Sequence, residues 1–178
     1  MSRNVSGQAY ALSVLAPIRD GHTDELRAHL DALEEGDKSP LARAPGTHIA
    51  RWVVIGGVVY QGAGQPRRDQ LSPRLLFSSN FDGDVGAYLE GLRTGMAEDA
   101  DAIWGHCRDY PGHENSGAFR AYMRAYQLEA ALFFAAYGDQ TVGEVRANVE
   151  QRRRLIDFAL AGQGLDAATL KSRFLETF

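Results

Sequence analysis

Two segments decide the fold: THIARWVVIGGVVY, residues 47–60, and RLLFSSNFDGD, residues 74–84. In both, polar groups stand among large apolar side chains, a pattern that predicts two strands. Burying a polar side chain without a partner costs roughly 1–3 kcal/mol or more. The strand pair is therefore either a structural hydrogen-bond network or the wall of a ligand pocket.

The other elements follow from hydrophobic spacing, caps and turn residues. The expected order is a strand at 8–18, a helix from 23 to 36, strands at 47–60 and 74–80, a helix at 85–107 with a kink near 95, a short helix from 116, a strand at 128–137, and helices at 141–161 and from 166. Asp82 or Asp84 caps the helix after the third strand, and Ser116 caps the short helix. Thr141 and Glu144 form a capping box.

The order of strands and helices is that of a ferredoxin-like (βαββαβ) α+β fold, with one antiparallel sheet and helices on one face. The run LEAALFFAAY at 128–137 allows two interpretations, because alanine favours a helix whereas its length and the Gly138-Asp139 end favour a buried strand. We take it as the fourth strand. We expect residues 1–164 to form the domain and residues 165–178 a helical tail.

Composition restricts the class of protein. The chain has 178 residues, of which 44% are hydrophobic and 24% charged, enough for one domain with its own core. A net charge of -4 offers no basic surface, so we expect neither nucleic acid nor a membrane as partner. The single cysteine, Cys107, excludes an intrachain disulfide, and no signal core is present. We expect a cytoplasmic protein.

One face of the predicted sheet would be bare in a monomer. We expect either a second subunit, and hence a homodimer, or the C-terminal helices to cover it.

Four stretches, THIARWVVI, LLFSSNFDGD, DAIWGHCRDYPG and FFAAYGDQTVGEVR, resemble an uncharacterised bacterial family with a ferredoxin-like fold. This resemblance covers roughly residues 9–161. The fold of the family is similar in plan to that of the dimeric α/β-barrel superfamily. That superfamily includes cofactor-free monooxygenases and haem enzymes such as dye-decolourising peroxidases. The resemblance implies a cavity for a small-molecule ligand and suggests haem as a cofactor, but it transfers no catalytic residue. Only the Asp82-Gly83 half of the peroxidase G-x-x-D-G motif is present.

His48 and Arg51 are the candidate catalytic residues. By strand alternation His48 shares a face with Trp52, whereas Arg51 points to the other face. His48 is either a haem ligand or general base, or a strand-end histidine bonded to a neighbouring loop. Arg51 either holds an anionic ligand or a haem propionate, or forms a buried salt bridge.

Three further residues, Trp52, Asn80 and Asp82, are candidates for binding the ligand. Asn80 would orient it, whereas capping of the next helix explains Asp82 equally well. His106 is the candidate metal residue, as an alternative haem ligand, with Cys107 and His113 near it in sequence. The alternative there is a buried, inert thiol beside a histidine at a helix C-terminus, because zinc needs three or four ligands at tighter spacing.

Together with these polar residues, the resemblance implies an enzyme that acts on a small apolar or aromatic metabolite, an oxidoreductase of the monooxygenase or haem-peroxidase type. The alternative is a non-catalytic small-molecule binding or assembly protein. A third hypothesis takes Leu170, Phe174 and Phe178, at positions i, i+4 and i+8 of the last helix, as a docking stripe for a partner. His22 and His29 lie seven residues apart on one helix, about 10 Å, which is too far for one metal ion.

Overall fold

The computed structural model describes residues 8–56 and 72–178, which belong to two compact units, Met1–Thr141 and Val142–Phe178. The end of the second predicted strand, residues 57–60, and residues 61–71 of the loop after it lie outside the described residues. The boundary between the units comes before the helix that we expected to belong to the sheet domain. Within the described ranges, no helix is both long enough and apolar enough to cross a membrane.

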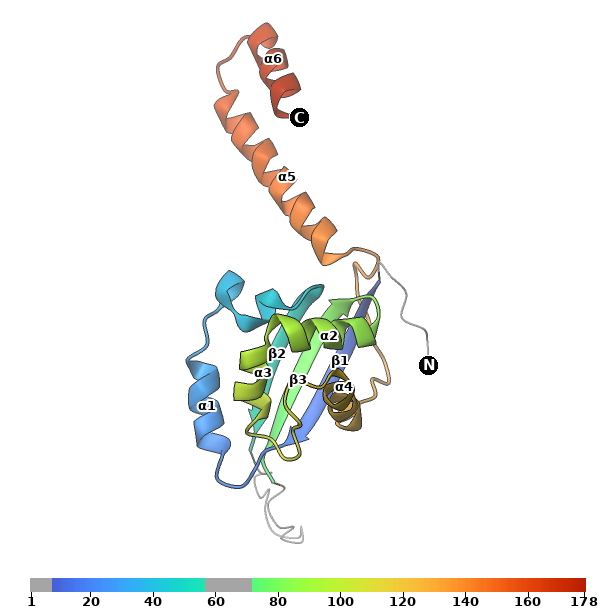
Figure 1. Ribbon diagram of the computed structural model, residues 1–178. Coiled ribbons are helices and arrows are strands. Elements are labelled where there is room, and N and C mark those ends of the chain that lie inside the picture. The colour runs from blue at the N-terminus through green and yellow to red at the C-terminus, as the bar shows by residue number, and fades with distance from the viewer. Residues whose placement is uncertain (1–7, 57–71) are drawn as a thin grey trace, which may run out of the picture. The chain divides into compact units, whose positions relative to one another are not determined.

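Four strands form the sheet of the first unit (Figure 1). They are β1 (Ala9–Pro17), β2 (Thr47–Ile55), β3 (Arg74–Asp82) and β4 (Gln127–Leu128). Their order in the sheet is β2-β3-β1-β4, and every neighbouring pair is antiparallel. The fold is therefore α+β with an open antiparallel sheet, in an order compatible with the ferredoxin-like type.

The two central strands divide the side chains between two faces. β1 and β3 pair along their whole length, from Ala9 opposite Asp82 to Pro17 opposite Arg74. Every second residue is buried, because successive side chains point to opposite faces of a sheet. The buried set is Leu12, Val14, Ala16, Leu75, Phe77, Ser79 and Phe81. The other face, here called the open face, includes Ser13, Ser78 and Asn80 and is only partly buried.

Helices cover the buried face (Figure 1). They are α1 (Thr23–Asp31), α2 (Val85–Gly95), α3 (Ala97–Trp104) and α4 (Ser116–Ala125), with 3-10 turns at Gly36–Lys38 and Pro40–Arg43. The expected kink near Gly95 is a break between α2 and α3. The first helix ends at Asp31, before the predicted Gly36, which begins a 3-10 turn with φ +64° instead.

The helix caps were predicted in part. The Asp84 carboxylate accepts hydrogen bonds from the N–H groups of Gly86 and Ala87 at 2.8 and 3.0 Å, as expected for the cap of α2. Asn115, not Ser116, caps α4, because its side chain accepts from the N–H of Ala118. Asn115 and Ser116 are adjacent and both are common N-cap residues, and Asn115 occupies the N-cap.

Trp104 of α3 is fully buried at the centre of the core. Its ring meets Phe77 of β3, Trp52 of β2 and Phe119 of α4, with centroids 5.4, 6.1 and 6.3 Å apart. Edge-on aromatic pairs of this kind add about 0.5–1.5 kcal/mol each beyond the burial of their area. One side chain therefore joins α3 to two strands and to another helix.

The prediction of a fourth strand over residues 128–137 was wrong. β4 contains only Gln127 and Leu128, and Leu132 and Phe134 farther along are 89% and 83% exposed. Leu128 is paired with Ser13, a register that would bring Leu132 opposite Ala9 if it continued. Instead, the carbonyl of Gly138 accepts from the N–H of Ala9 at 2.7 Å. The chain therefore returns to the start of β1 at Gly138, and the residues between Leu128 and Gly138 lie outside the sheet.

The second unit consists of α5 (Val142–Ala161) and α6 (Ala167–Thr177). Phe158 of α5 packs against Phe174 and Phe178, with ring centroids 5.7 and 5.8 Å apart. Two residues of the predicted docking stripe therefore hold α6 to α5. Asp166, the residue type that caps helices at the position where the sequence predicts the last helix to begin, is the N-cap of α6.

The break between α2 and α3 provides a test of packing. A Cβ at Gly95 would lie against the carbonyl oxygen of Arg43, closer than real contacts allow, and backbone cannot yield as a flexible side chain does. Gly95→Ala should therefore lower the free energy of unfolding by about 1–3 kcal/mol, measured by urea denaturation. Gly56→Ala is the matched control, because the end of the Arg27 side chain is the only described group within 4 Å of its Cβ position. Equal stability of the two variants would contradict this packing.

Candidate functional site

The candidate site lies where the end of β1 meets the end of α3. Ile18 forms an isolated antiparallel bridge with Cys107. Beside it, the N–H of Arg19 donates to the carbonyl of His106 at 2.9 Å. These contacts fix the backbone of His106 next to the turn that begins α1.

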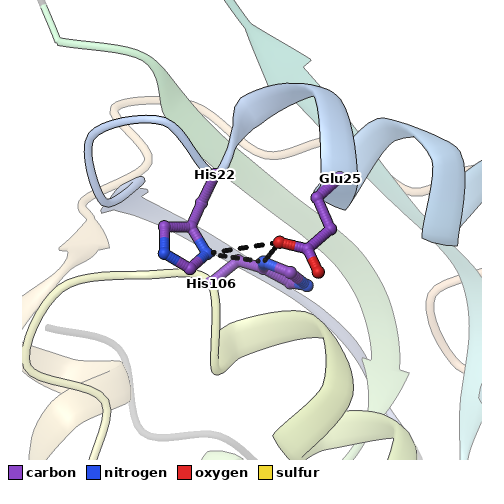
Figure 2. A group of neighbouring side chains, drawn as sticks. All are labelled: His22, Glu25 and His106. Atoms are coloured by element: carbon purple, nitrogen blue, oxygen red, sulfur yellow. Dashed lines mark hydrogen bonds and ion pairs between the residues drawn. The ribbon is translucent and has the colours of Figure 1, made fainter.

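Three side chains point toward one another there, those of His22, Glu25 and His106 (Figure 2). The Nδ1 atoms of the two histidines are 3.1 Å apart. The Oε2 atom of Glu25 lies 3.7 Å from the Nδ1 of His22 and 3.8 Å from that of His106. Ligands held about 2.1 Å from a tetrahedral ion lie about 3.4 Å from one another. The three atoms therefore already have the spacing of metal ligands.

The start of α1 positions two of these residues. His22 is the N-cap residue, and Glu25 stands three positions later in the first turn. Side chains three positions apart lie on one side of a helix, so both reach His106. Glu25 also lies in the first turn of α1, where a carboxylate interacts favourably with the positive end of the helix dipole.

The electrostatics of the site favour neutral imidazole at His106. Burial is the main cause that lowers the pKa of His106, and the side chain is only 15% exposed. The Glu25 charge opposes this shift, whereas His22, Arg19 and His29 add to it. Neutral imidazole is the form that binds a metal ion. Glu25 is 71% exposed, so the carboxylate side of the group is open to solvent.

His48 and Asp82, both predicted as site residues, do meet in the structure. The Nε2 of His48 lies 2.7 Å from the Oδ1 of Asp82, where β2 begins and β3 ends. A bulge between Thr47 and Ile49 interrupts β2 at this point, so the alternation that predicted the face of His48 does not hold. The pair joins two strand ends, in keeping with the structural alternative for His48.

The other predicted residues of the strands lie on opposite faces of the sheet. Trp52 packs on Phe77 and Trp104 in the core. Arg51 and Asn80 belong to the open face, and Arg51 is exposed rather than buried in a salt bridge. Within residues 8–56 and 72–178, its guanidinium has no hydrogen-bond or ion-pair partner. The predicted set therefore does not line one pocket.

The sequence neighbours of His106 do not join it. Burial raises the pKa of Cys107 to about 12, so its thiol stays protonated and is a poor ligand. His113 pairs instead with Asp101, whose carboxylate lies 2.7 Å from Nδ1 and accepts from the backbone N–H at 2.9 Å. The partners of His106 come from α1.

Sequence reasoning missed His22 and Glu25 as partners of His106. A local signal was present, because His-x-x-Glu at the start of a helix places an imidazole and a carboxylate on one side. His106, however, lies 84 residues from His22, and no local pattern indicates the bridge that brings them together.

The lowered pKa of His106 predicts a pH-dependent stability that is measurable without metal. In an unfolded chain a histidine titrates near about 6.5. Between the lower folded value and this one, the unfolded chain binds more protons, so the free energy of unfolding falls as the pH falls through that window. Urea denaturation at pH 7 and pH 5 with a chelator should show a smaller loss for His106→Gln than for the unmodified chain. An equal loss in both would contradict the assignment.

Comparison with known proteins assigns no family. No protein-family model, no curated protein and no solved structure matches the chain. The chemistry of the site must therefore be argued from its own residues.

Proposed function

We propose that the protein binds a divalent transition-metal ion through His22, Glu25 and His106, and that it is an oxidoreductase acting on a small apolar or aromatic metabolite. One observation carries this proposal: the three ligand atoms all lie within 4.8 Å of one another. Two imidazoles and one carboxylate on the same side of an ion are typical of non-haem iron oxygenases, in which the other positions stay open.

The number of ligands favours a reactive ion over a structural one. Structural zinc sites are closed by four protein ligands, whereas catalytic sites keep a position for water or substrate. Cys107 does not supply a fourth ligand, because its thiol is buried and protonated. The exposed side at Glu25 gives a small molecule access to the ion.

Haem fits this group of ligands poorly. A porphyrin occupies the four equatorial positions of its iron and leaves two axial positions on opposite faces. Three ligand atoms crowded on one side cannot share these two positions. His48 could offer haem only its Nδ1, because its Nε2 already contacts Asp82. We therefore favour a bare ion over haem.

Metal binding is testable on the full chain after treatment with a chelator. Titration calorimetry with Co²⁺ should show binding, and His22→Ala, Glu25→Gln and His106→Ala should each weaken it at least about tenfold, since even outer-shell partners contribute 10–100-fold. His113→Ala is the matched control, because that histidine also pairs with a carboxylate. Circular dichroism checks that each variant is folded. Unchanged affinity in the three ligand variants would refute the site.

The redox part of the proposal has its own test. The ferrous protein should consume dissolved oxygen in the presence of a panel of aromatic metabolites, and His106→Ala should not. A site that binds Zn²⁺ tightly while the ferrous protein consumes no oxygen would keep the metal and reject the oxidoreductase.

A non-catalytic binding protein is the second candidate, and the open face favours it. Arg51 lies opposite Ser78 in the register, and Asn80 lies on the same face two residues further along β3. A guanidinium that no described residue neutralises suits a carboxylate ligand, which it can hold by two hydrogen bonds. In that case Arg51→Gln would reduce the binding of small carboxylates and leave metal binding unchanged.

We also propose that the protein is a homodimer. Apolar side chains of β2 on the open face support this, since Ile49, Val53 and Ile55 are 69%, 40% and 42% exposed. Pairing of two open faces would give the dimeric α/β-barrel arrangement. The middle of this face is polar, however, which suits a ligand better than a dry interface, so a dimer contact through α5 is the alternative to it.

A further inference from the structure

The long helix α5 carries an apolar stripe, here called the α5 stripe. It consists of Val145, Val149, Ile156 and Leu160, which are 39%, 53%, 42% and 63% exposed. Their positions, i, i+4, i+11 and i+15, place them on one face of the helix. Arg154 and Phe158, which contact Phe178 of α6, are each two positions from Ile156. At about 100° per residue they point about 200° away, so α6 packs on the opposite face.

Charges of both signs follow one edge of the α5 stripe. Arg146, Glu150, Arg153 and Asp157 stand at i, i+4, i+7 and i+11. Glu150 and Arg153 form an ion pair within the helix at 3.3 Å. Arg146 and Asp157 have no ion-pair or hydrogen-bond partner in the part of the chain that the structure describes. These two charges are free to pair with groups outside it.

We infer that α5 binds α5 of a second copy in antiparallel orientation, about a two-fold axis between Gln151 and Arg152, the middle of the helix. Arg146 stands as far before this midpoint as Asp157 stands after it. Each arginine therefore meets the aspartate of the other copy, and the two-fold axis repeats the contact. A parallel pair would bring Arg146 level with its own counterpart. The inference is independent of the metal site.

The α5 stripe fits the same axis. Val145 falls between Leu160 and Ile156 of the second copy, and Val149 falls between Ile156 and Arg152 of the second copy. This alternation lets side chains of two helices interlock as knobs in holes. Arg152 is the polar residue of the seam, and its two copies meet at the axis. A central charged layer lowers stability but fixes the register, because a shift would set it against apolar side chains.

Analytical ultracentrifugation of the full chain over a concentration series tests the inference. We expect a dimer whose dissociation constant rises at least about 100-fold in Ile156→Glu, which places a carboxylate in the apolar seam. Leu175→Glu is the matched control, because Leu175 is 69% exposed on α6 and should leave the dimer intact.

Charge reversal separates the antiparallel pair from nonspecific association. Arg146→Glu alone and Asp157→Arg alone should each weaken the dimer about tenfold, because the symmetry repeats each repulsion. The double variant should recover most of the affinity. Arg152→Leu should tighten the dimer, because it removes the charged layer.

Three results would overturn the inference. One is a chain that stays monomeric at all concentrations. Another is a set of stripe variants that lower the melting temperature without changing the mass, which would mean that the stripe packs within its own chain. The third is a dimer that Ile49→Glu dissociates and Ile156→Glu does not, which would assign the contact to the sheet.

Discussion

The pairing of β1 with β3 is the constraint on which the rest of the first unit depends. Because both strands follow one register from end to end, their buried side chains form a continuous face, which Trp104 closes from the helical side. A slip by one residue would turn Val14 and Phe77 toward the open face. The register also sets where β1 ends, and hence that Ile18 meets Cys107. The geometry of the histidine group is thus a consequence of the sheet.

Sequence patterns correctly predicted the elements that depend on interactions between residues close in sequence. The alternation in the first three strands apart from the bulge at His48, the break near Gly95 and the caps at Asp84 and Asp166 depend on residues close in sequence, and the structure has them. The run at 128–137 is different, because composition allows a strand there, whereas the contact that returns the chain to β1 at Gly138 joins residues far apart in sequence. Local sequence patterns also could not predict the boundary between the two units. A capping box predicts where α5 starts but not which element α5 packs on.

The sequence indicated only part of the candidate site. His106 was named as a candidate metal residue, and the start of the helix after His22 was predicted at the right position, but a contact across the fold joins the two histidines. His48 and Asp82 were nominated separately and meet because a bulge turns the start of β2. Periodicity assigns a residue to a face, and it does not say which faces come together.

The bridge at Ile18 and Cys107 has a consequence for turnover in the cell. His22, Glu25 and His106 come from two distant segments and lie together only in the folded chain, so an ion bound as proposed would stabilise the folded state. It would add RT ln(1 + [M]/Kd) to the folding free energy, about 2.7 kcal/mol when the free ion is at 100 times Kd. Metal supply would then govern how often the chain opens to proteases, and a cell short of the ion would degrade the empty protein first.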